Sequence, residues 1–315
     1  MMTRRSFINL GWLSLMNLMS GSAFPVYKHA ADYMSDSALS FYSFALAILM
    51  LLPFMLRERR TAKLARGSDP ATTRPLQLKS WLLLGSAILP SSIGLSWGIK
   101  HSSGSNGAIL YLTVPILMLI LAVPLLGERL NWTRVGTFML AIAGTVLVSR
   151  DDLIGGQFTL STLLGNLVIL SACFGSAFFN IYSKTVLAHY TGIEVLIYSY
   201  AVAAVLCVVA SYCIDVRPFY DVAQVPASTW FAIAALGGVI WGMSMVLYLW
   251  LLKRLDVGQV SVSLYQQVFF GVLLSALLLG ERLRLAQIVG GITVILATLL
   301  AESHERRLAR TAKAA

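Results

Sequence analysis

A six-residue motif, Leu-Leu-Gly-Glu-Arg-Leu, occurs twice in this chain, at Leu125–Leu130 and again 153 positions later at Leu278–Leu283. Each copy ends one long apolar segment and leads into another. Such an internal duplication predicts a fold built from two related halves. The same offset, or one of 156, pairs further identical residues: Trp97 with Trp250, Lys100 with Lys253, Ser20 with Ser176, and Lys28 with Lys184.

The composition restricts the environment in which this chain can fold. Of its 315 residues 57% are hydrophobic and only 12% are charged, whereas about a quarter of the residues in soluble domains are charged. We therefore predict an integral membrane protein. The net charge of +10 does not indicate nucleic acid, because the basic residues are scattered at the ends of apolar segments. The three cysteines show no metal-binding or disulfide spacing.

The apolar segments predict an all-α fold. A bilayer core needs about 20 apolar residues per helix, and the first segment continues from Phe7 past Ala23 to Tyr27, so we expect it to be retained and not cleaved as a signal peptide. Ten transmembrane helices are predicted, at 6–28, 35–56, 80–100, 106–126, 132–149, 162–186, 193–214, 229–252, 257–279 and 285–301.

The positive charges predict the orientation of these helices. With ten spans both termini share one side of the membrane, and that side holds 18 of the 24 Lys and Arg residues, so we expect both termini to be cytoplasmic in a multi-pass protein of the plasma (inner) membrane. Five spans per half is an odd number, so the second half is inverted relative to the first. The predicted units are a first repeat (1–150), an inverted second repeat (151–302) and a basic cytoplasmic tail (303–315).

With this plan the chain resembles the EamA family of the drug/metabolite transporter superfamily. The resemblance rests on the motif after the fourth span of each half, on Thr113-Val114-Pro115, on Lys28, and on the run from Tyr248 to Arg254. The second half departs from it with Gln266-Gln267-Val268 in place of Thr113-Val114-Pro115, and with Ala297 in place of Gly144. The resemblance implies a metabolite or amino-acid exporter or a solute facilitator, with a central cavity between the repeats and with spans five and ten at the periphery.

The duplicated motif itself has two interpretations, an ion site or a structural turn. Gly127 and Gly280 suit a left-handed helix C-cap, and the acidic residues after them suit the N-terminus of the next helix. The arginines can reach lipid head groups. We favour the turn, so the structural motif residues are Gly127, Glu128, Arg129, Gly280, Glu281 and Arg282.

The centres of the spans hold no Asp, Glu, Lys or Arg, but they hold neutral polar and aromatic side chains. Adjacent Gln266 and Gln267 point about 100° apart on a helix, so one can face a cavity while the other bonds to a neighbouring helix. Trp241 suits either a cavity wall or tight packing. The candidate substrate-binding residues are Asn17, Tyr111, Thr113, Ser176, Asn180, Trp241, Tyr265, Gln266 and Gln267.

His29 and His101 lie at the predicted outer ends of spans one and three. Histidine titrates near neutral pH, so both are candidates for a proton-linked role. An interfacial histidine with no special role is the alternative.

These observations predict a secondary transporter that exports small amphipathic metabolites, such as amino acids or their derivatives, by alternating access to a central neutral-polar and aromatic site. The alternatives are a non-transporting receptor or assembly factor, and an intramembrane enzyme, although the chain lacks an HExxH motif. We expect no enzymatic activity, cofactor or metal. The expected partners are a small-molecule substrate and the lipid bilayer, but no nucleic acid, and a homodimer is left open.

Overall fold

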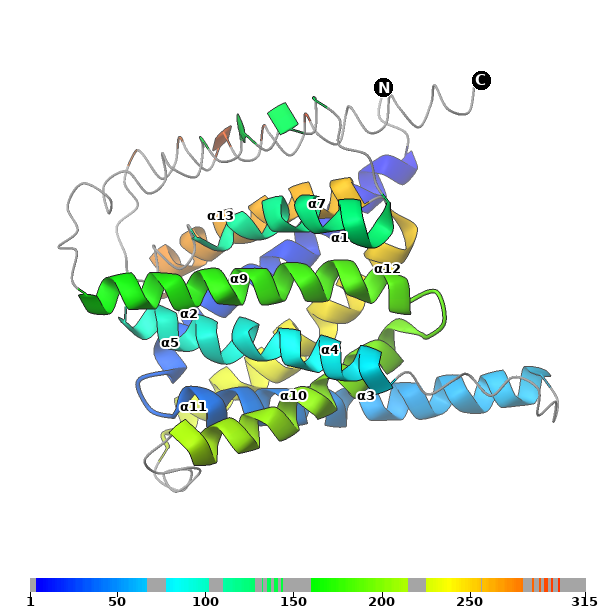
Figure 1. The fold of residues 1–315 in the computed structure, drawn as a ribbon, viewed down its shortest axis with the longest axis horizontal. Helices are drawn as coiled ribbons and strands as arrows, with labels where there is room; N and C mark the ends of the chain where they lie inside the picture. The colour runs from blue at the N-terminus through cyan, green and yellow to red at the C-terminus, as the bar shows by residue number, and fades with distance from the viewer. Residues whose placement is uncertain are drawn as a thin grey trace.

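The computed structural model describes residues 4–66, 78–101, 110–127, 160–214, 225–255 and 257–279, with isolated positions between 132 and 143 and between 285 and 300. Every element within these ranges is a helix (Figure 1). The elements are α1 (Arg4–Gly21), α2 (Ala23–Ala30), α3 (Asp36–Arg66), α4 (Leu78–Leu89), η2 (Pro90–Gly94), α5 (Leu95–His101), α7 (Thr113–Leu126), α9 (Leu160–Val186), α10 (Gly192–Ile214), α11 (Ala227–Ala234), η4 (Ala235–Ser244), α12 (Met245–Arg254) and α13 (Val257–Leu279).

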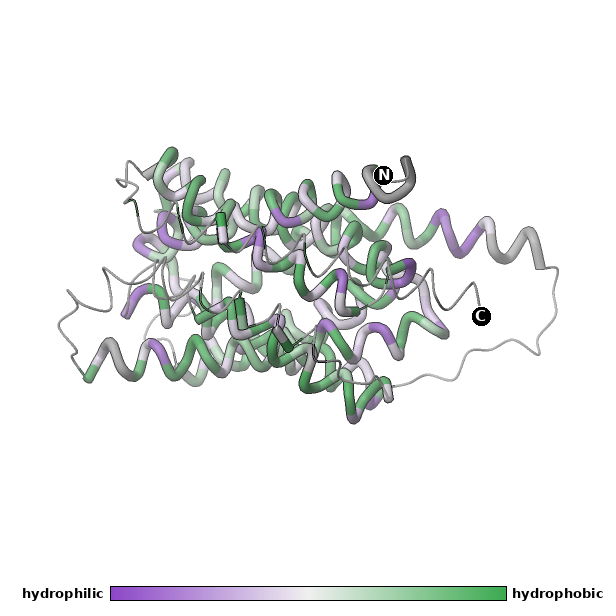
Figure 2. Tube along the Cα trace, turned by 90° about the horizontal axis from the view of Figure 1, so that it is seen from above, coloured by the Kyte–Doolittle hydropathy of each residue, from purple (hydrophilic) through white to green (hydrophobic). Residues whose placement is uncertain are grey.

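Six helical segments of the described chain are long and apolar enough to cross a membrane. They correspond to predicted spans two, three, six, seven, eight and nine, and hydrophobic residues predominate along them (Figure 2). The fourth span is the shorter helix α7, and the first is two helices, α1 and α2, separated by a turn at Ser22. Spans five and ten and the tail 303–315 fall mostly or wholly outside the described residues, so the structure does not establish the count of ten.

Helix α3 is longer than the predicted span 35–56, because it continues to Arg66. The sequence from Arg57 to Lys79 holds seven basic residues together with Gly67, Asp69, Pro70 and Pro75, which predicts a flexible cytoplasmic connector and not a helix over residues 57–66. Residues 57–66 are rich in Arg, Glu, Ala and Lys, which are strong helix formers. The helix therefore extends about three turns beyond its apolar part.

Two of the membrane helices change to π-helical geometry near their middle. The first change, η2, begins at Pro90, which has no N–H to donate to the helix ladder. The second, η4, contains Gly237, Gly238 and Gly242. The two segments occupy the third span of each half, so the local widening of the helix recurs with the repeat.

Corresponding helices of the two halves run in opposite directions, as α1 and α9 do in Figure 1. Their packing partners also correspond, because α1 packs against α13 as α9 packs against α7, and α4 against α10 as η4 against α3. This arrangement is the one expected for two repeats related by a pseudo-twofold axis.

The two halves also correspond at the crossings where a glycine of one helix lies against the backbone of another. A Cβ atom on Gly237 would lie 2.6 Å from the Ser43 carbonyl oxygen, and one on Gly85 would lie 2.9 Å from that of Ser199. Ser43 and Ser199 are 156 positions apart. Glycine is required at both crossings, since a side chain would force the helices apart.

The starts of α3 and α10 are also equivalent. The Glu194 N–H donates to Thr191 Oγ1 at 3.3 Å, while the Thr191 N–H donates to Glu194 Oε2 at 3.1 Å, which is a capping box. The Ala38 N–H donates to Ser35 Oγ at 3.4 Å, and Ser35 precedes Thr191 by 156 positions. Local sequence therefore starts both helices in the same way.

The third residue of the first copy of the duplicated motif, Gly127, has a left-handed backbone conformation. Gly127 has φ 67° and ψ 21°, and its N–H donates to the carbonyl of Val123 at 3.1 Å. This geometry ends α7 in the manner expected of a glycine C-cap. Glu128, Arg129, Gly280, Glu281 and Arg282 lie outside the described residues.

Candidate functional site

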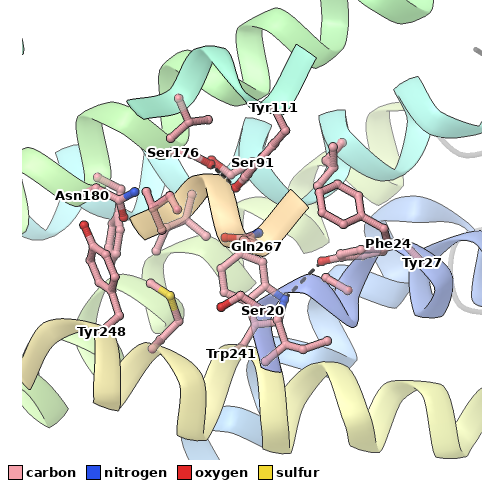
Figure 3. Close-up of a pocket in the computed structure, with 18 residues that line it drawn as sticks. Ser20, Phe24, Tyr27, Ser91, Tyr111, Ser176, Asn180, Trp241, Tyr248 and Gln267 are labelled. Carbon is pink, nitrogen blue, oxygen red and sulfur yellow. Dashed lines mark hydrogen bonds between the residues drawn. The ribbon is translucent and has the colours of Figure 1, made fainter. Parts of the chain in front are cut away.

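A cavity of about 80 Å³ lies between the two halves, and its lining side chains come from the first, third, fourth, sixth, eighth and ninth predicted spans (Figure 3). Its polar and aromatic lining consists of Ser20, Phe24, Tyr27, Ser91, Tyr111, Ser176, Phe179, Asn180, Trp241, Tyr248 and Gln267. The remaining lining residues are apolar: Ala23, Ile88, Leu95, Val114, Ile240, Met245 and Leu264. No lining side chain carries a formal charge.

Helical periodicity explains how each segment delivers its residues to the cavity. Ser20, Phe24 and Tyr27 stand at positions i, i+4 and i+7 of the first span, and Trp241, Met245 and Tyr248 have the same spacing in the eighth. This spacing puts three side chains on one face of a helix. The two faces oppose each other across the cavity, where Trp241 Nε1 donates to Tyr27 Oη at 3.1 Å (Figure 3).

The first and eighth spans are joined by a second contact, between serine hydroxyls. Ser20 Oγ and Ser244 Oγ are 2.5 Å apart, and Ser244 Oγ is also 3.3 Å from the carbonyl oxygen of Met16. In the other half Ser91 Oγ lies 3.3 Å from the carbonyl oxygen of Ala172. Ser91 and Ser244 are 153 positions apart, so equivalent serines join equivalent helices on both sides of the cavity.

Aromatic neighbours hold Trp241 in place. Its ring packs edge-on against Phe44, with centroids 5.0 Å apart, and against Tyr200, with centroids 5.9 Å apart. Tyr200 Oη donates to the Trp241 carbonyl at 2.7 Å. Phe44 and Tyr200 therefore hold the indole ring in position, and its N–H group faces Tyr27.

On the opposite wall, Tyr111 Oη and Ser176 Oγ are hydrogen-bonded at 2.8 Å, and the Tyr111 ring packs edge-on against Phe24. Asn180 Nδ2 donates to a weak acceptor, Met118 Sδ, at 3.5 Å. Tyr248 is 3% exposed, and its hydroxyl finds no hydrogen-bond partner among the residues that the structure describes. Asn180 and Tyr248 both line the cavity (Figure 3).

Five of the nine predicted substrate-binding residues line this cavity: Tyr111, Ser176, Asn180, Trp241 and Gln267. The other four, Asn17, Thr113, Tyr265 and Gln266, do not. Asn17 Nδ2 and Thr113 Oγ1 donate to carbonyls of their own helical turn, those of Leu13 and Leu110. Gln266 Oε1 accepts from Ser14 Oγ at 3.0 Å, and Tyr265 is buried in the core.

The sequence-based selection did not include Ser20, Phe24, Tyr27, Ser91 or Tyr248, which also line the cavity. The signal that identifies three of them is the i, i+4, i+7 stripe of Ser20, Phe24 and Tyr27. The same stripe in the eighth span identifies Tyr248 from Trp241.

The two histidines do not line the cavity. His101 Nδ1 lies 2.9 Å from the carbonyl oxygen of Trp97, and the two rings stack with centroids 3.9 Å apart. His29 packs near Tyr33. Neither histidine therefore has a direct contact to the cavity through which the predicted proton-linked role could act. No cluster of three His, Cys, Asp or Glu side chains occurs in the described part of the chain.

The fold and a cavity enclosed by two related helical halves define the architecture of a membrane transporter. A solved crystal structure has the same fold, with a TM-score of 0.72 and 18% sequence identity over 94% of this chain and 96% of the other. The sequence profile of the EamA-like transporter family matches residues 8–150 and 163–302. The chain therefore belongs to the EamA-like transporter family and is a multi-pass membrane protein.

Relatives of this chain carry transporter names with different directions of transport. It is 26% identical to the probable terminal-alkyne amino-acid exporter of Streptantibioticus cattleyicolor over 65% of this chain and 66% of that protein. It is 24% identical to the uncharacterized transporter YyaM of Bacillus subtilis over 90% of each chain. It is 25% identical to the S-adenosylmethionine uptake transporter of Rickettsia bellii over 65% of each chain. These names describe transporters, not enzymes.

Proposed function

We propose that this protein is a secondary transporter that exports small amphipathic metabolites, such as amino acids or their derivatives. The observation that carries the proposal is the cavity between the two halves, because both halves line it with neutral hydrogen-bonding and aromatic side chains. In this proposal the protein has ten transmembrane helices in two inverted repeats and has both termini in the cytoplasm.

The lining favours a solute without net charge. A net charge in the membrane interior is costly unless a counter-charge meets it, and every lining side chain is uncharged. A zwitterion or neutral solute instead finds hydroxyl, amide and indole groups for its polar end, supplied by Tyr111, Ser176, Asn180, Trp241 and Gln267. Phe24 and Phe179 supply an apolar wall. The relative named as an amino-acid exporter supports this class of substrate.

The cavity volume indicates a closed conformation. A space of about 80 Å³ holds about two or three water molecules, which is less than a whole metabolite occupies. Solute binding therefore requires the helices to separate. The Trp241–Tyr27 hydrogen bond joins the two halves across the cavity, so we infer that this bond breaks when the cavity opens.

The test is transport by purified protein in liposomes. A panel of labelled amino acids, amino-acid derivatives and neutral metabolites is loaded inside or outside, and flux is compared with protein-free liposomes. The proposal predicts saturable flux of at least one amphipathic solute, competition by unlabelled solute, and little flux of strong anions. An absence of flux across the whole panel, in a preparation that is folded by circular dichroism, contradicts it.

A further inference from the structure

A second hollow lies on the outer surface of the helix bundle, and we refer to it as the α1–α12 groove. It has a volume of about 470 Å³, and its lining is apolar. The lining residues come from α1, α3, α10, η4 and α12: Trp12, Leu15, Met19, Met50, Leu51, Phe54, Ile193, Met243, Val246, Leu247 and Trp250.

The groove and the central cavity share no lining residue, but they are separated by only one helix. Helix α12 directs Met245 and Tyr248 to the cavity and Val246, Leu247 and Trp250 to the groove. The groove is therefore a separate site on the far side of a cavity wall.

One end of the groove is aromatic and positively charged. The rings of Trp12 and Trp250 meet edge-on across it, with centroids 6.4 Å apart. The Arg254 guanidinium lies 3.8 Å from the centre of the Trp250 ring, and Lys253 beside it is exposed. The remainder of the lining carries no charged side chain. A ligand that fits this pattern has a long apolar part and a negatively charged head.

The equivalent place in the other half of the protein is closed. There α5 packs directly on α9, because Gly98 allows it: a Cβ on Gly98 would lie 2.4 Å from Ile169 Cγ1 and 3.0 Å from the Gly165 carbonyl oxygen. At an offset of 153 the positions of Gly94 and Gly98 are taken by Leu247 and Leu251. The larger leucine side chains keep α12 away from α1. The groove therefore forms here because leucines replace the glycines that allow close packing at the equivalent place.

We propose that the α1–α12 groove binds one acyl chain of an anionic phospholipid whose phosphate lies against Arg254. The surrounding bilayer supplies this ligand at high concentration. A methylene group is about as large as a water molecule, whose share of liquid volume is about 30 Å³, so the groove accommodates about fifteen of them. Arginine recognises phosphate with its planar donors, and the stacked Trp250 ring restricts the guanidinium to the mouth of the groove.

The test is native mass spectrometry of the full chain in detergent, with added dioleoyl phosphatidylglycerol or dioleoyl phosphatidylcholine. We expect one retained phosphatidylglycerol per chain and weaker retention of phosphatidylcholine. Leu15→Trp fills the groove from a position that is already 42% exposed and should abolish the retained lipid. Val205→Trp, at a 63% exposed position of α10 outside the groove, is the matched control and should leave it unchanged.

A second pair of variants tests the head-group contact. Arg254→Gln should lower the affinity for phosphatidylglycerol about fivefold, as expected for the loss of one basic residue at a membrane surface. It should lower the affinity for phosphatidylcholine less, because the choline ammonium group already neutralises the phosphate charge of that lipid. Arg60→Gln, an exposed arginine on α3, is the control. Equal retention of lipid by the wild-type chain and Leu15→Trp overturns the proposal. A dimer that Leu15→Trp dissociates also overturns it, because a second copy then covers the groove.

Discussion

The Tyr248 hydroxyl gives a prediction with two effects of opposite sign. This side chain is 3% exposed, lines the cavity and has no hydrogen-bond partner among the described residues. A buried hydroxyl without a partner costs about 1–3 kcal/mol. Tyr248→Phe removes that cost, so the variant should be more stable to thermal unfolding than the wild-type protein. Water held in the 80 Å³ cavity would reduce the gain toward the lower limit.

The same substitution should weaken transport if the Tyr248 hydroxyl forms a hydrogen bond with the transported solute. The loss of one neutral hydrogen bond costs about 0.5–1.5 kcal/mol, which corresponds to an increase in KM of about two- to tenfold. Tyr200→Phe is the matched control, because Tyr200 Oη already donates to the Trp241 carbonyl, and this variant should lose stability. A less stable Tyr248→Phe protein, or one with unchanged KM, refutes the reasoning.

Further predictions concern helix packing and orientation. Gly237→Ala places a methyl group 2.6 Å from the Ser43 carbonyl oxygen and should destabilise the protein by about 1–3 kcal/mol, whereas Gly11→Ala, with open space around it, should be neutral or slightly stabilising in thermal unfolding. In a Cys213→Ser background, which removes the exposed native cysteine of α10, a cysteine introduced by Ser68→Cys should resist a membrane-impermeant thiol reagent in intact cells and react after lysis; labelling from outside would contradict the cytoplasmic orientation.

The main features of the fold were predictable because hydrophobic length and duplication are properties of sequence alone. The turn at Ser22 was not predicted, because the apolar pattern continues through it and no turn-forming dipeptide such as Gly-Pro or Asn-Gly marks the position. The helical extension to Arg66 was missed for the opposite reason. A charge-rich segment next to a membrane helix was interpreted as a connector, although its residues favour helix.

For the cavity, mid-span polarity identified five lining residues but also selected four that pack elsewhere. In membrane helices, Ser, Thr and Asn side chains commonly bond to a carbonyl of the preceding turn, as Asn17 and Thr113 do. Only packing decides which polar side chains remain for a cavity. Adjacent Gln266 and Gln267 illustrate this point, because α13 is rotated so that Gln267 lines the cavity while Gln266 contacts Ser14.

These two glutamines also provide the most direct test of the claim that the cavity is the transport site. Gln267→Ala and Gln266→Ala make the same chemical change one residue apart, and the KM and maximal rate of each variant are measured in liposomes for a solute that the wild-type protein moves. The account predicts that Gln267→Ala raises KM about two- to tenfold and that Gln266→Ala, which loses its Ser14 contact, lowers thermal stability and leaves KM unchanged. A wild-type KM for Gln267→Ala together with a raised KM for Gln266→Ala would contradict it.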